Sequence, residues 1–60
     1  MMNYDWQTNI ENYAMMVVEE YGTGVVDSVF TRYDATCFED LSPAFYSEVF
    51  SDLQMIAEDK

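Results

Sequence analysis

The chain lacks histidine altogether and has only one cysteine, one proline and two glycines among its 60 residues. Without histidine, a catalytic site built on imidazole is excluded. A structural zinc site is excluded as well, because it normally takes about four Cys and His ligands. The lone Cys37 cannot form a disulfide within the chain. A domain this short must therefore gain its stability from a dense apolar core, from self-association, or from both.

Positive charge is also scarce. Arg32 and Lys60 are the only basic side chains against twelve carboxylates, which gives a formal net charge of −10. Helices in soluble proteins commonly interleave Glu with Lys at i,i+4, and this chain forgoes almost all of that support. A net charge of about 2–8 in magnitude is enough to keep a small domain soluble. The excess favours a basic partner, and it argues against direct binding to nucleic acid or to an anionic membrane.

Long apolar runs are missing too. No segment approaches the roughly 18 apolar residues that cross a bilayer, and the N-terminal residues lack the basic and apolar regions of a signal peptide. The sequence therefore predicts a soluble, cytoplasmic protein. In that compartment Cys37 is expected to be a reduced thiol buried beside Phe38.

Apolar residues, by contrast, are plentiful. Half of the chain is apolar and 17% is aromatic, which sets it apart from disordered acidic tails, since those are poor in aromatics. We expect one folded domain over residues 1–60, with residues 1–5 expected to be disordered.

The first predicted helix spans residues 8–21. Asp5 and Thr8 are alternative N-caps, and Thr8 with Glu11 has the spacing of a capping box. The apolar residues that follow recur at the spacing of one helix face, namely Ile10, Tyr13, Ala14, Val17, Val18 and Tyr21. Gly22 stands where a left-handed C-cap residue is expected.

The second predicted helix spans residues 24–33, with Thr23 as its cap. Its apolar stripe again has helical spacing, with Val26, Val29, Phe30 and Tyr33 as its members. The β-branched valines leave a strand as the rival interpretation, but the spacing favours a helix.

Residues 34–41 are expected to form a connector with one short helical turn near 37–40. Thr36 and Glu39 have capping-box spacing, and Phe38 and Leu41 would hold the turn on the core.

The third predicted helix spans residues 43–58. Ser42 is a preferred N-cap residue, and Pro43 suits the first helical position because its missing N–H would be unsatisfied there. The core stripe of this helix comprises Tyr46, Val49, Phe50, Leu53 and Ile56 with Ala57. Three helices with short connections predict an all-α, compact three-helix domain.

The carboxylates offer little support for catalysis. A general acid–base pair needs two carboxylates in different environments within a cleft, and three short helices provide little cleft. Di-iron bundles need Glu-x-x-His motifs, and no EF-hand pattern occurs. A nucleophilic Cys37 would need an activating neighbour, and only Arg32 is available. The sequence predicts a non-enzymatic protein without catalytic residues, metal ligands or cofactors.

The spacing of some carboxylates suggests a sharper role. Glu48 and Asp52 lie about 6 Å apart along a helix axis, and Glu11 and Glu19 about 12 Å apart. Carboxylates so spaced on a rigid helix could occupy a phosphate-binding groove of a nuclease. The plainer interpretation is a solvated acidic face that serves solubility.

Exposed apolar residues give a second indication. Met15 and Met16 are expected on the flanks of the first helix beside Glu19 and Glu20, and Trp6 precedes that helix. Met and aromatic residues are enriched at the centres of interfaces. The alternative is that Trp6 folds back as a staple and Met16 belongs to the edge of the core.

The segment Tyr33–Pro43, continuing through Tyr46, Glu48–Phe50 and Leu53, resembles small acidic proteins carried by phages, plasmids and conjugative elements of Firmicutes. That class includes anti-CRISPR and antirestriction proteins, which bind an effector nuclease, often where DNA would bind. The resemblance implies a direction for function and carries over no functional residue, because the class shares no motif.

The sequence thus predicts a protein that works by binding a basic protein, such as a nucleic-acid-processing enzyme that it inhibits. The expected contact residues are Glu11, Glu19, Glu20, Glu48, Asp52, Trp6, Met15 and Met16. The alternative is a small homo-oligomeric structural or regulatory module whose acidity serves solubility. Self-association as a homodimer is a separate prediction, which rests on the small core and the many aromatic residues.

Overall fold

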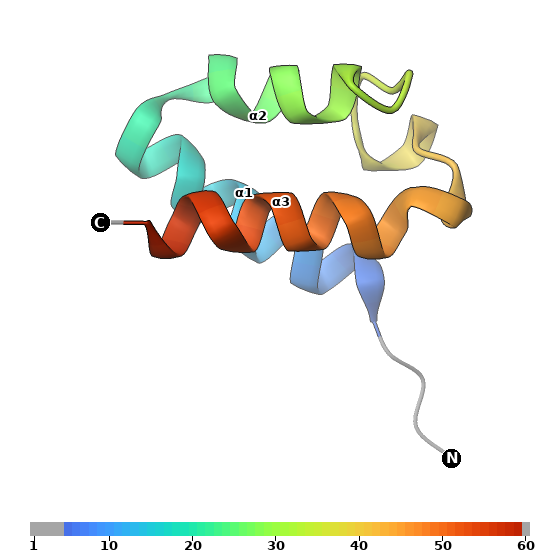
Figure 1. Cartoon of the computed structure of the whole chain (residues 1–60), viewed down its shortest axis with the longest axis horizontal. Coiled ribbons are helices and arrows are strands. Elements are labelled where there is room, and N and C mark those ends of the chain that lie inside the picture. The colour runs from blue at the N-terminus through green and yellow to red at the C-terminus, as the bar shows by residue number, and fades with distance from the viewer. Residues whose placement is uncertain (1–4, 60) are drawn as a thin grey trace.

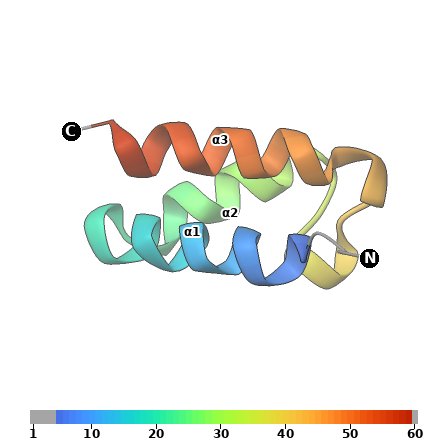
Figure 2. The ribbon, with the colours of Figure 1, turned by 90° about the horizontal axis from the view of Figure 1, so that it is seen from below.

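The computed structural model describes residues 5–59. They form three α-helices and two 3-10 turns, in chain order α1 (Trp6–Tyr21), α2 (Thr23–Thr31), η1 (Phe38–Asp40), η2 (Pro43–Phe45) and α3 (Tyr46–Glu58). α1 and α3 lie side by side and run in the same direction, and α2 returns across them in the opposite direction (Figures 1 and 2). The predicted all-α three-helix domain is confirmed, with no strand within the described residues.

The core lies where the three helices meet, and α1 and α3 share the most extensive contact. Every buried residue is apolar among the described ones: Ile10, Val17, Val26, Val29, Phe30, Ala35, Leu41, Val49 and Leu53. Aromatic side chains pack around this centre, and they are only partly buried. The apolar stripes recognised in the sequence therefore supply most of the core, with Ala35 and Leu41 added from the connector.

Helix α1 begins two residues earlier than its apolar pattern indicated. Asp5 is its N-cap and accepts hydrogen bonds from the Thr8 backbone N–H at 3.1 Å and the Thr8 hydroxyl at 2.7 Å. These bonds hold the pKa of the Asp5 carboxyl below its usual value. The prediction of a capping box at Thr8 and Glu11 was wrong, because the Thr8 hydroxyl donates its hydrogen bond to Asp5. Residues 1–4 of the expected disordered segment lie outside the described residues, and Asp5 is ordered as the cap.

One residue, Gly22, joins α1 to α2. Its backbone angles are φ 91° and ψ 173°, and its N–H donates to the Val18 carbonyl at 2.8 Å. These angles differ from the left-handed cap that the sequence predicted, and they lie in a region open almost only to glycine. Gly22 also occupies the N-cap position of α2, so Thr23 is helical and not a cap. Tyr21 was expected in the core and is 48% exposed, because the chain turns away directly after it.

Helix α2 ends at Thr31, two residues before the predicted boundary. Asp34 adopts φ 61°, the Ala35 N–H donates to the Phe30 carbonyl, and the Asp34 N–H donates to the Thr31 carbonyl. This is a Schellman motif with aspartate at the left-handed position, and buried Ala35 and Phe30 provide its apolar contact. Aspartate tolerates that conformation better than most residues other than glycine, so no glycine marked the helix end in the sequence.

The connector forms the expected short turn as η1. The predicted capping box between Thr36 and Glu39 does not form. The Asp40 carboxylate takes that place and accepts hydrogen bonds from the Thr36 backbone N–H at 3.3 Å and the Thr36 hydroxyl at 3.4 Å. Cys37 is exposed, so its predicted burial was wrong. Leu41 is buried in the core as expected, and Phe38 packs against the core and stacks on Tyr46 with ring centroids 4.8 Å apart.

Helix α3 is preceded by the 3-10 turn η2, so the α-helical part begins at Tyr46 and not at Pro43. Ser42 holds the N-cap position of η2, but its side chain makes no capping hydrogen bond there. Proline at the first position suits this turn as it suits an α-helix, because its missing N–H has no partner to lose.

Candidate functional site

The carboxylates are spread over the surface and do not form a cleft. All of them except Asp52 belong to exposed residues. No three Cys, Asp or Glu side chains within residues 5–59 come together in a way that could hold a metal ion. The buried carboxylate that an acid–base site would require does not occur in this part of the chain.

Asp52 of α3 bonds to two residues that directly follow α2. Its Oδ2 accepts a hydrogen bond from the Tyr33 hydroxyl at 2.7 Å and lies 3.4 Å from Arg32 Nη1. The Asp52 side chain is 25% exposed and Arg32 is 61% exposed. The sequence placed Asp52 with Glu48 as a free pair of contact carboxylates, but the structure uses Asp52 to join the end of α2 to α3. Only Glu48 of that pair is exposed.

The hydrogen bond to Asp52, with partial burial, raises the pKa of the Tyr33 hydroxyl above its ordinary value of 10.0. Because the folded pKa is raised, this bond contributes its full stability below the ordinary tyrosine pKa. Its contribution is lost as the pH rises through the raised value. We expect Tyr33→Phe to lower the free energy of unfolding by about 1 kcal/mol at neutral pH.

A urea titration at neutral pH and again at alkaline pH checks this expectation. The stability difference between wild type and Tyr33→Phe should shrink at the alkaline pH. Tyr21→Phe is the matched control, since its hydroxyl donates to the Asp59 backbone carbonyl at 3.1 Å and does not meet a carboxylate. A Tyr33→Phe variant as stable as wild type at neutral pH would contradict this role for Asp52.

One end of the bundle is strongly negative. The Tyr21–Asp59 hydrogen bond brings the C-terminal ends of α1 and α3 together, and four carboxylates lie there: Glu19, Glu20, Glu58 and Asp59. Neither helix has a basic residue in its last turn. The partial negative charge at both helix C-termini therefore adds to the charge of these carboxylates. We call these four residues the acidic end.

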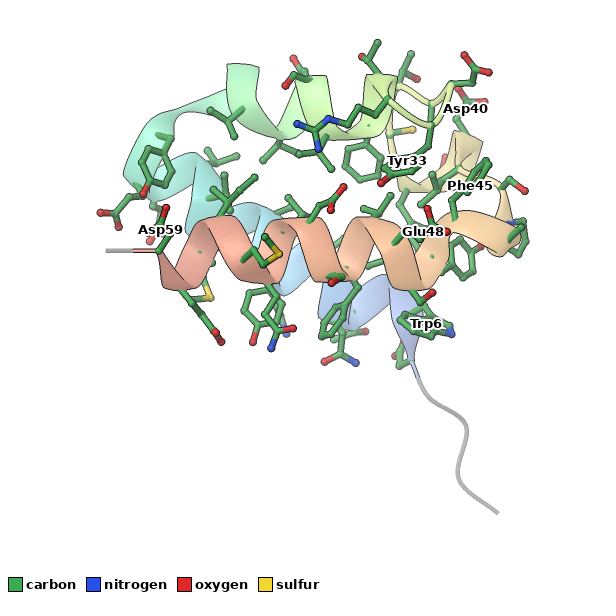
Figure 3. The ribbon with its side chains drawn as sticks, in the orientation of Figure 1. Trp6, Tyr33, Asp40, Phe45, Glu48 and Asp59 are labelled. Atoms are coloured by element: carbon green, nitrogen blue, oxygen red, sulfur yellow. The ribbon has the colours of Figure 1, made fainter. Side chains whose placement is uncertain are left out.

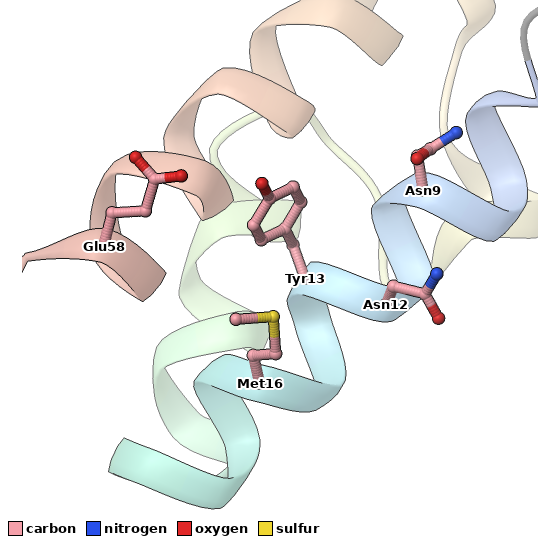
Figure 4. Close-up of a pocket in the computed structure, with 5 residues that line it drawn as sticks. All are labelled: Asn9, Asn12, Tyr13, Met16 and Glu58. Atoms are coloured by element: carbon pink, nitrogen blue, oxygen red, sulfur yellow. The ribbon is translucent and has the colours of Figure 1, made fainter.

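A partly apolar groove leads away from the acidic end between α1 and α3, on the side that α2 does not cover. Figure 4 shows its hollow, where Tyr13 and Met16 of α1 lie opposite Glu58 of α3, beside Asn9 and Asn12. Phe50 of α3 packs edge-on against Tyr13 of this hollow, with the two ring centroids 5.3 Å apart. Trp6 follows, 5.9 Å from Phe50 in an edge-on contact. We call this surface the α1/α3 groove.

The predicted contact residues divide between these features. Glu11, Glu19, Glu20 and Glu48 are exposed, as are Met15 and Met16 at 60% and 48%. Trp6 is the first residue of α1 and is half-buried against Phe50 and Tyr46 of α3, so it packs between the two helices and does not fold back on its own helix as a staple would. Figure 3 places Trp6 and Asp59 at opposite ends of the molecule.

Sequence reasoning missed three members of the groove, namely Tyr13, Phe50 and Glu58. Tyr13 and Phe50 were assigned wholly to the core, but both are only partly buried. Their position at the edge of the apolar stripe was the available signal, because a stripe wider than its partner helix leaves its border exposed. Met55, 68% exposed on α3, was also not singled out.

Comparison of the chain with protein-family models, curated proteins and solved structures gives no match in any of the three. The resemblance to acidic proteins of mobile elements therefore stays a prediction. None of the described helices is both long and apolar enough to pass through a lipid bilayer.

Proposed function

We propose that this protein acts by binding, without catalysis, and that its target is a basic protein such as a nuclease or another nucleic-acid-processing enzyme. It would serve in the cytoplasm as an inhibitor or accessory protein of the mobile-element type. The observation that carries the proposal is the unbalanced surface charge. Carboxylates are exposed on every helix, and Arg32, the only basic side chain of the described residues, is paired with Asp52.

The charge would act mainly on the rate and selectivity of association. A surface of one sign attracts a partner of the opposite sign over about one Debye length, about 8 Å at physiological salt. The exposed carboxylates Glu11, Glu19 and Glu48 stand on helices whose positions the core fixes. The backbone positions of these residues are thus held in advance, and binding has to order only their side chains.

Binding at a nucleic-acid site is the specific form of inhibition that we propose. If this proposal holds, adding the acidic protein at low salt should release a DNA-binding protein from immobilised duplex DNA. The acidic protein and the DNA would compete for the same basic surface of that DNA-binding protein. The matched control is the triple variant Glu11→Gln, Glu19→Gln, Glu48→Gln, which keeps side-chain size and leaves the Asp52 bonds in place. We expect the triple variant to elute at least about tenfold less protein, since each lost contact weakens a charge-steered complex.

Identification of the eluted proteins by mass spectrometry reads out this experiment, and the variant's helical circular dichroism shows that it is folded. Equal elution by wild type and the triple variant would contradict the role of these carboxylates. Elution of nothing by wild type would contradict competition with nucleic acid.

The alternative function is a homo-oligomeric structural or regulatory module, and the exposed methionines favour it. Met15, Met16 and Met55 are each about half exposed or more, and such side chains are common in interfaces. Sedimentation equilibrium separates the two functions. A monomer mass near 7.0 kDa at high micromolar concentration would exclude the oligomeric module.

A further inference from the structure

We infer that the α1/α3 groove is a docking site for a basic amphipathic helix of the partner, with the partner's lysines or arginines at the acidic end. This inference rests on the proposed function and names the part of the protein that would make the apolar contact. It does not depend on whether the partner site also binds nucleic acid.

The first argument is the spacing of the residues that border the groove. On α1 they are Asn9, Asn12, Tyr13 and Met16, at positions i, i+3, i+4 and i+7. Residues at these positions share one face of a helix, as the residues that pack against a neighbouring helix do. Phe50 of α3 lies opposite this row, against Tyr13. The surface between the two parallel helices therefore has the shape and spacing to accept a further helix.

The second argument is that the row is incompletely covered. Tyr13 and Phe50 are half-buried, and Met16 is 48% exposed beside them. α2 packs on the other side of the α1–α3 pair (Figure 1). Met is an adaptable side chain, and it is common at surfaces that accept an amphipathic helix.

The third argument is charge, and it decides which occupant fits. Glu58 lines the groove where it meets the acidic end, and the C-terminal dipoles of α1 and α3 add negative charge there. A second copy of this chain would bring the same acidic end and would be repelled. A partner helix with an apolar face and cationic flanks complements both parts of the surface.

The experiment uses a designed helical peptide of leucine and lysine without aromatic residues as the probe. Trp6 is the only tryptophan of the chain and lies in the groove beside Phe50, so its fluorescence reports occupancy directly. We expect saturable binding with one peptide per protein and a change in Trp6 emission. A peptide with the same composition but scrambled, so that it has no apolar face, should bind at least about tenfold more weakly, because the apolar contact contributes to affinity.

Two pairs of variants separate groove binding from general attraction. Met16→Gln should weaken binding about fivefold or more, whereas Met15→Gln, on the same turn but outside the hollow, should leave the affinity nearly unchanged. Glu58→Gln should weaken binding more than Asp27→Asn, which removes one charge on α2, the helix on the other side of the α1–α3 pair. The circular dichroism of each variant confirms its helicity.

Equal effects within each pair, or equal binding of the scrambled peptide, would overturn the groove and leave only diffuse electrostatic attraction. A concentration-dependent dimer that Met16→Gln abolishes would overturn it in favour of a second copy. Failure of the peptide to bind, with elution from DNA still observed, would refute the groove and leave the proposed function standing. Peptide binding in the groove without any elution from DNA would refute the proposed function and leave the groove standing.

Discussion

Replacing Leu53 with alanine should unfold most of the protein at room temperature. Leu53 is fully buried at the centre of the core formed by α1, α2 and α3. Truncating a buried leucine costs about 2–5 kcal/mol, from lost burial and from the cavity that remains. A single core in a domain this small rarely provides more than about 3–5 kcal/mol in total, so the expected loss is comparable to the whole stability.

Circular dichroism with urea or thermal denaturation measures this effect. Met55→Ala is the matched control two residues along the same helix, because Met55 is 68% exposed. We expect that variant to lie within about 0.5 kcal/mol of wild type. A folded Leu53→Ala variant with near wild-type stability would show that the three helices do not pack around Leu53 as described.

Replacing Gly22 with alanine should lower the free energy of unfolding by about 1–3 kcal/mol, because φ 91° with ψ 173° is costly for any residue with a Cβ. A Cβ at this position meets no atom within 4 Å, so steric conflict with the rest of the fold adds nothing. The cost arises from the backbone of the connection between α1 and α2 alone.

Gly24→Ala, two residues later, should have the opposite effect and raise the free energy of unfolding. Gly24 lies within α2 with open space around its Cβ position, so alanine should stabilise the helix by up to about 1 kcal/mol. Thermal denaturation of both variants tests the pair. Equal shifts of the melting temperature, or a stabilised Gly22→Ala variant, would contradict the geometry of this connection.

The helices could be predicted because their signals are local. Apolar periodicity gave the core positions Ile10, Val17, Val49 and Leu53 directly, and all four are fully buried. The predicted helix ends were less accurate, because capping depends on which of several nearby polar groups forms the capping hydrogen bond. Asp5 displaced Thr8 as the cap of α1, and Asp34 ended α2 without the usual glycine.

Burial in the connector could be predicted only in part. Leu41 was expected on the core and is buried, whereas Cys37 was expected to be buried and is exposed by the path of the backbone into η1. Periodicity gives no information in a segment of one 3-10 turn.

The candidate site shows the same division. Sequence reasoning found the exposed methionines and the acidic residues of α1, since both follow from helix phase. It could not show that Asp52 bonds to Tyr33, 19 positions away in the chain. It also could not show that the ends of α1 and α3 meet to form the acidic end, because that depends on tertiary packing.

The most direct test of the central claim is affinity capture with the immobilised protein from a lysate of cells that carry it. The column is washed at about 0.15 M and then at about 0.5 M salt, over which the Debye length falls from about 8 Å towards a few Å. We predict that one basic, nucleic-acid-processing protein is retained at low salt and released at high salt, and that the triple Glu→Gln variant does not retain it. Retention of a partner that resists high salt and binds the triple variant equally, or of no partner at all, would contradict the account.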